Sequence, residues 1–174
     1  MEKIKLKNVS VSVFIATSLI VIFCLYLTVA IKTLPCGKDL LSVFLSNFVH
    51  IDLYHLISNL FALYALSRVE REIGIKRFLI LIIFLLTFTS IFEVLLFKLN
   101  LAKNCSIGFS GILFGVMTWE LIINKELDII LILSIISMLT FPSIKNSKIS
   151  FVGHSIGVIV GVITGIIWKN IIKI

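Results

Sequence analysis

Three stretches of the 174-residue chain place polar side chains inside otherwise apolar sequence, and together they hold all three histidines. One contains His50, His55 and Asn59, one contains Ser110, and the last contains His154. A serine becomes a nucleophile when a histidine serves as its base. The oxyanion that forms when a serine attacks a carbonyl needs hydrogen-bond donors, and His55, Asn59 and the backbone N–H of Ser110 are suitable donors. These residue types favour acyl transfer by a nucleophilic serine.

The composition restricts where such a site can lie. Hydrophobic residues make up 59% of the chain and charged residues 14%, against roughly 25% charged residues in ordinary soluble domains. So much apolar surface excludes both a soluble globule and intrinsic disorder. The net charge of +7 comes from short basic clusters between apolar runs, which is typical of membrane proteins rather than of nucleic-acid binders. We therefore expect one polytopic helical membrane domain, in contact with a lipid bilayer and with no nucleic-acid partner.

Six apolar runs are candidates for membrane-spanning helices. A helix needs about 20 apolar residues to cross a hydrocarbon core of roughly 30 Å. The runs lack the alternation of membrane β-strands, so each of them predicts a helix. The six predicted spans cover residues 9–31, 53–66, 78–97, 108–123, 127–141 and 151–168. With the amino terminus inside, ten Lys and Arg residues lie on the cytoplasmic side and six lie outside, which predicts a multi-pass protein of the cell membrane with both termini in the cytoplasm.

The polar side chains are predicted to lie at one depth in the membrane. The polar or charged residue that marks the expected cytoplasmic end of each helix comes 13 residues after His55, 14 after Ser110 and 15 after His154. At about 1.5 Å of rise per residue, these distances are about 20 to 22 Å. The three side chains are therefore expected about 10 Å below the outer boundary of the hydrocarbon core. Asn59 lies one turn deeper than His55 on the same helix face.

Glycines accompany two of the polar stretches. The last span carries a four-residue repeat formed by Gly153, Gly157, Gly161 and Gly165. Such spacing lets a neighbouring helix approach closely, backbone to backbone. Gly157 follows His154 by three residues, so we expect this approach to bring His154 toward the helix of Ser110. Gly108 and Gly111 flank the serine and favour a tight turn there.

These residues resemble the rhomboid family of intramembrane serine proteases, over a region from about Phe44 to Trp168. The resemblance rests on His50 with His55-x-x-x-Asn59, then Gly108-Phe109-Ser110-Gly111, then His154-x-x-Gly157-x-x-x-Gly161. Glu70 and Gly74 also resemble the loop after the second span of the family. The chain departs from the family in its first outer loop, from about Lys32 to Asn47, which lacks a Trp-Arg pair of many bacterial members, and in Glu70-Arg71-Glu72, where the family has Glu-x-Arg.

The resemblance implies a fold and a reaction. The fold is a bundle of six transmembrane helices around a short fourth helix that carries the serine. Ser110 would be the nucleophile and His154 its base, with no third acidic member. His55, Asn59 and the amide of Ser110 would form the oxyanion hole, and His50 would support the site. The implied activity is a serine endopeptidase that uses no cofactor or metal and cuts single-span membrane proteins in or near the membrane.

Three alternatives remain open. A catalytically inactive relative that binds client membrane proteins would typically lack the serine or the histidine, and both are present. A metal site could use three histidines, although His50 and His55 are five residues apart and point to different faces of a helix. A small transporter could use Glu93, Glu120 and Asp128, although the chain shows no inverted repeats. We expect these acids to pair with Ser, Thr or backbone groups, or to lie near an interface.

The chain contains three cysteines. Cys24 falls in the first predicted span and is expected to be a small apolar filler. Cys36 and Cys105 fall on predicted outer loops, where a disulfide is chemically allowed in an oxidising exterior.

Overall fold

The computed structural model describes residues 10–28, 39–102, 106–124, 128–145 and 151–172. Every regular element in these ranges is a helix, which confirms the all-helical prediction for the described residues. The helices are α1 (Val11–Leu27), α2 (Leu40–Ser46), α3 (Leu53–Ile73), α4 (Ile75–Lys98), α5 (Ser110–Ile123), α6 (Ile129–Lys145) and α7 (Phe151–Ile172). Cys36 and Cys105 lie outside the described residues.

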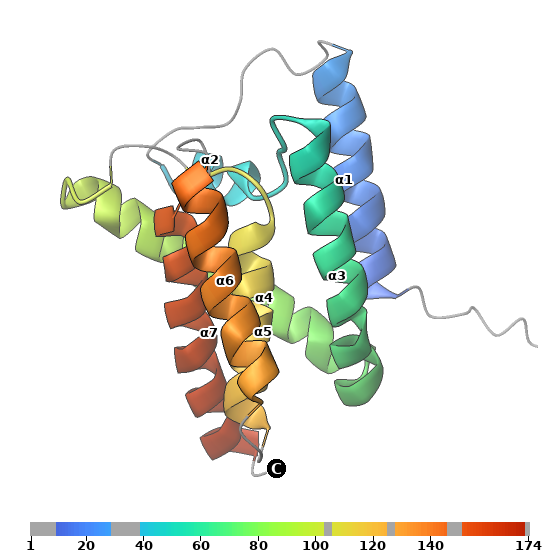
Figure 1. The fold of residues 1–174 in the computed structure, drawn as a ribbon, viewed down its shortest axis with the longest axis vertical. Coiled ribbons are helices and arrows are strands. Elements are labelled where there is room, and N and C mark those ends of the chain that lie inside the picture. Colours follow the sequence, from blue (N-terminus) through green and yellow to red (C-terminus); the bar gives the residue numbers. More distant parts are fainter. Residues whose placement is uncertain (1–9, 29–38, 103–105, 125–127, 146–150, 173–174) are drawn as a thin grey trace, which may run out of the picture.

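Helix α5 lies inside the bundle, in contact with α3, α4, α6 and α7 (Figure 1). Its residues from Ile112 to Glu120 are all buried. A helix that is apolar around its whole circumference belongs in a core. Its 14 residues rise only about 21 Å, which is less than the roughly 30 Å thickness of a membrane core. The central helix, which begins at Ser110, is therefore too short to cross a membrane core by itself.

Each of the six predicted spans falls on a helix, and one further helix is present in the described ranges. Helix α3 continues past the predicted span at residue 66 to Ile73 and stops at Gly74, whose φ is +86°. Gly74 in the sequence predicts this short extension, because glycine tolerates such a cap conformation. Helix α2 was not predicted. It is only seven residues long, begins at an Asp39 cap and buries Val43 against Phe97 and Ala102. A helix this short depends on such tertiary contacts, which local sequence does not reveal.

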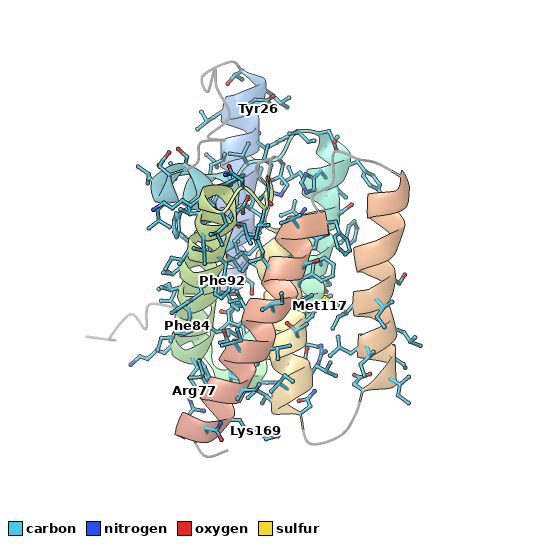
Figure 2. All side chains as sticks on the ribbon, turned by 90° about the vertical axis from the view of Figure 1, so that its left-hand side faces the viewer. Tyr26, Arg77, Phe84, Phe92, Met117 and Lys169 are labelled. Carbon is cyan, nitrogen blue, oxygen red and sulfur yellow. The ribbon has the colours of Figure 1, made fainter. Side chains whose placement is uncertain are left out.

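The outside of the bundle is apolar, as the side chains in Figure 2 illustrate. Phe14 is 67% exposed, Phe61 71% and Ile130 78%. Large exposed hydrophobics on several helices are unusual in a soluble monomer and suit contact with lipid. Cys24 is also exposed on α1, so its prediction as a packing filler was wrong: it lies on the outer face of the helix.

Within the described ranges, two helices are long and apolar enough to cross a membrane, Ile75–Lys98 and Phe151–Asn170. Val11–Leu27 and Ser110–Ile123 are shorter apolar helices. The six crossings, the single polytopic domain and the cytoplasmic termini stay predictions.

The carboxylate of Glu70, near the end of α3, holds the start of α1. It accepts hydrogen bonds from the hydroxyls of Ser10 and Ser12 at 2.8 and 2.6 Å, and from the backbone N–H groups of Val11 and Ser12 at 2.7 and 2.9 Å. Burial raises the pKa of this carboxyl and the hydrogen bonds lower it by more, so the pKa lies below its usual value. The ionised carboxylate of Glu70 therefore stabilises the packing of α1 against α3.

We expect Glu70→Gln to lower the free energy of unfolding by about 2 kcal/mol, because an amide offers a single acceptor oxygen to several donors. Thermal unfolding in detergent measures this change. Wild-type stability should fall as the pH drops below about 4, since a group with a lowered pKa stabilises the fold only when ionised, and Glu70→Gln should show a weaker pH dependence. Glu72→Gln, an exposed change on the same helix, is the control, and an equal loss there would contradict the prediction.

Candidate active site

Ser110 is the first residue of α5, and the residues before it are held from two sides. The N–H of Gly108 donates to the backbone oxygen of Ser46 at 3.0 Å, and the N–H of Ser106 donates to the Glu93 carboxylate at 2.7 Å. Gly108 has a φ of +102°, which residues with a side chain rarely adopt. The first N–H groups of a helix have no acceptor within the helix. The backbone N–H of Ser110 can therefore donate a hydrogen bond to a bound group.

His154, in the first turn of α7, meets Ser110 side chain to side chain. Its Nε2 lies 2.8 Å from the Oγ of Ser110, although the two residues are 44 positions apart in the chain. This is the distance that a nucleophile and its base require. Nε2 can accept the hydroxyl proton when Nδ1 carries the ring proton. His154 itself is buried.

Packing against an aromatic ring orients the His154 imidazole. The ring centre of Phe114 lies 4.7 Å from that of His154, with 34° between the planes. Within the described part of the chain, Nδ1 of His154 has no hydrogen-bond partner. Phe114 is four residues after Ser110, so both lie on one face of α5. Sequence reasoning missed Phe114, because its spacing from Ser110 is a weak signal in a chain with 14 phenylalanines.

Helix α7 packs on α5 backbone to backbone. A Cβ atom added to Gly157 would overlap the carbonyl oxygen of Gly111 and lie 2.8 Å from its carbonyl carbon. A Cβ atom at Gly161 would overlap atoms of α5 in the same way. Because Gly111 directly follows Ser110, and Gly157 is one turn from His154, this contact sets the distance between the two polar side chains.

The start of α3 lies against the residues that precede Ser110. A Cβ atom on Gly108 would come within 2.5 Å of the His55 ring, so the imidazole packs directly on this glycine. Asn59 is buried one turn deeper and donates its side-chain N–H to the backbone oxygen of His55 at 2.8 Å. His50 is fully buried, and its ring centre lies 4.9 Å from that of His55. Their roles as oxyanion donors and as a supporting group stay predictions.

We expect His55→Ala and Asn59→Ala each to lower the rate of peptide cleavage by about 10²-fold, the usual cost of losing one oxyanion donor. The losses should be smaller than that of Ser110→Ala and should fall mainly on kcat. Initial rates with a single-span model substrate in detergent measure them. The control is Ser58→Ala, an exposed change on the same helix, which should cleave at the wild-type rate. Wild-type rates in both His55→Ala and Asn59→Ala would show that neither residue belongs to the site.

The other acidic residues near the spans have structural partners. Glu120, buried in α5, pairs with Arg68 of α3 at 2.6 Å, and Asp128 accepts a hydrogen bond from the N–H of Leu131 at 2.9 Å. The expected pairing with Ser, Thr or backbone groups holds for Glu93 and Asp128. Glu120 pairs instead with Arg68, the residue that marks the expected cytoplasmic end of the second span. Among the described residues, no three His, Cys, Asp or Glu side chains gather closely enough to hold a metal ion.

The chain is similar to known proteins over most of its length. Residues 37–170 match the model of the Rhomboid domain family. The chain is also 34% identical to a protein of Acanthamoeba polyphaga mimivirus that is named as a rhomboid protein, and the match covers 72% of the chain and 73% of that relative.

Proposed function

Because the chain belongs to the rhomboid family, we propose that it is an intramembrane serine endopeptidase. Its substrates are single-span membrane proteins, which it cuts in or near their transmembrane segment. The observation that carries the proposal is the 2.8 Å contact between the Oγ of Ser110 and Nε2 of His154. An inactive, client-binding relative would have no need of this contact at the start of a buried helix.

The reaction follows from the positions of these atoms. The Oγ of Ser110 attacks the carbonyl carbon of the scissile bond, and its proton passes to Nε2 of His154. The resulting oxyanion is stabilised by the N–H of Ser110 and by donors from His55 and Asn59. His154 then returns the proton to the leaving amine, which leaves an acyl-enzyme on Ser110. Water, deprotonated by the same imidazole, releases the second product and restores the serine.

In the residues that the structure describes, the ring of His154 has no acidic partner. Its packing against the tilted ring of Phe114 supplies the orientation that a carboxylate gives in a Ser-His-Asp triad. The imidazolium that forms during the reaction is consequently stabilised less, and we expect slow turnover. In the proposed topology the site opens toward the outside of the cell, and both termini lie in the cytoplasm.

The test is direct. The purified protein is incubated in detergent with a model single-span substrate, beside the Ser110→Ala variant, and the products are identified by mass spectrometry. We expect two fragments from the wild type and none from the variant. Fragments that form at the wild-type rate in Ser110→Ala would reject a serine protease, and the absence of fragments with several helix-destabilised substrates would favour the client-binding alternative.

A further inference from the structure

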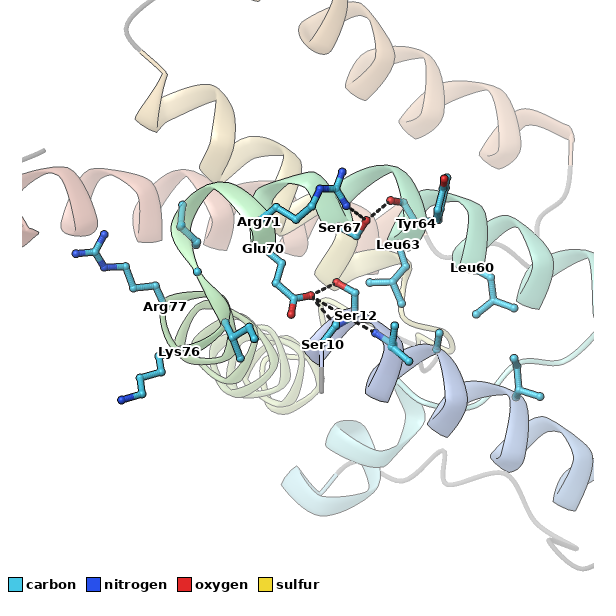
Figure 3. Close-up of a pocket in the computed structure, with 16 residues that line it drawn as sticks. Ser10, Ser12, Leu60, Leu63, Tyr64, Ser67, Glu70, Arg71, Lys76 and Arg77 are labelled. Carbon is cyan, nitrogen blue, oxygen red and sulfur yellow. Dashed lines mark hydrogen bonds between the residues drawn. The ribbon is translucent and has the colours of Figure 1, made fainter. Parts of the chain in front are cut away.

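A large cavity lies at the end of α3 opposite His55, between α1, α3 and the first turn of α4 (Figure 3). Its volume is about 1130 Å³, above the range of roughly 300–1,000 Å³ that is usual for small-molecule sites. The cationic end of the cavity, at Arg71, is 16 residues from His55 on α3, about 24 Å along the helix. None of the candidate site residues lines the cavity, so the proposed cleavage reaction leaves it without a role.

The cavity has an apolar part and a cationic part. Its apolar wall includes Ala16 and Ile20 of α1 and Leu60 and Leu63 of α3, and Figure 3 places Leu60 toward one end, away from the cations. The cationic part is lined by Arg71, Lys76 and Arg77. A long apolar wall that ends in cations matches an amphipathic ligand with a negative head.

The charges of the cavity are available to a ligand. Lys76 and Arg77 are exposed and form no ion pair within the described residues. Among the described residues, Arg71 donates one hydrogen bond, to the hydroxyl of Ser67 at 3.0 Å. The carboxylate in the cavity, Glu70, already accepts four hydrogen bonds from the start of α1. The three cations thus outnumber the one acid that lines the cavity, and in the described part of the chain none of them is paired with a carboxylate.

The length of the cavity identifies the class of ligand. Leu60 and Arg71 are 11 residues apart, about 16 Å along α3, and one leaflet of a bilayer core is about 15 Å thick. The cavity therefore has the length of a phospholipid acyl chain between Leu60 and Arg71, with the cations at the depth of its phosphate. The cations also belong to the end that we expect to face the cytoplasm, where anionic lipids are concentrated.

We propose that this cavity binds one anionic phospholipid of the cytoplasmic leaflet, with its acyl chain along α1 and α3 and its phosphate at Arg71, Lys76 and Arg77. The bound lipid fills the groove that separates α1 from α3 and shields the Glu70 hydrogen bonds from water. This inference is independent of the protease proposal.

Native mass spectrometry of the full chain in detergent tests the site. The protein is titrated with phosphatidylglycerol and, separately, with phosphatidylcholine. We expect tighter binding of phosphatidylglycerol to the wild type. The double variant Lys76→Gln/Arg77→Gln should bind it about 30-fold more weakly, since each cation near an anionic lipid surface contributes a factor of roughly five.

The matched control is Lys98→Gln/Lys169→Gln, which removes the same charge at exposed positions outside the cavity. It should change phosphatidylglycerol binding less than about twofold, and thermal unfolding checks that both double variants fold. Equal losses in the two double variants, or equal binding of both lipids to the wild type, would overturn the site. Competition by millimolar glycerol phosphate would show a site for a soluble phosphate and would equally overturn the lipid proposal. Because the readout is lipid binding, loss of cleavage has no bearing on it.

Discussion

Ser110→Ala, His154→Ala and the double variant are each expected to lose cleavage by a factor on the order of 10⁴ or more, and to nearly the same extent. A nucleophile and its base act as one unit, so removing the second after the first costs little more. The direct contact between the two side chains is the structural reason for this expectation. Initial rates with a single-span substrate, compared at equal concentrations of folded enzyme, measure the effect.

Folding is checked separately for these variants. Ser110→Ala removes one oxygen, whereas His154→Ala also removes the ring that packs on Phe114, so His154→Asn serves as a second variant with a smaller change in packing. A fluorophosphonate probe, which reacts with activated serines, should label the wild type and neither single variant. Additive losses, or labelling of His154→Ala at the wild-type rate, would show that His154 is not the base.

Gly157→Val is expected to lower the cleavage rate by about 10²-fold or more, although no reacting atom is changed. Its side chain would meet the backbone of Gly111, which cannot move aside without moving Ser110. A shift of about 1 Å between reacting groups is enough for such a loss. Crowding of a packed interface should also lower stability by about 1–3 kcal/mol. Cleavage and thermal unfolding are measured in the same detergent.

Gly165→Val is the matched control, on the same face of α7 and far from the serine. Its neighbour is a side chain, Ile122, whose Cβ lies 2.7 Å from the position of an added Cβ. We expect Gly165→Val to lose stability but to keep most of the activity of its folded fraction. The prediction would be contradicted if Gly157→Val were fully active and Gly165→Val had lost more activity. The critical helix contact would then lie near Gly165 and not near Gly157.

The helices and most residues of the candidate site could be predicted from the sequence, because a lipid environment restricts which secondary structures an apolar segment can form. Apolar runs in lipid must form helices to satisfy their backbone groups, so helix type and order followed from composition alone. Helix rise then placed His55, Ser110 and His154 at one level. The glycines correctly indicated a turn and a close helix contact, since Gly108 adopts a positive φ and Gly157 meets the α5 backbone. The residues of the site could therefore be listed before their geometry was known.

The side-chain contacts between distant parts of the chain could not be predicted from the sequence and are seen only in the tertiary structure. Equal depth does not decide which histidine reaches the serine, whereas the fold brings His154 of α7 to Ser110. The packing of Phe114 against His154, the short helix α2 and the attachment of Glu70 to α1 each depend on how elements pack, which local periodicity does not encode. The pairing of Glu120 with Arg68 likewise depends on how α5 packs against α3. Hydrophobicity thus determined which segments are helices, and close packing between them decided which side chains meet.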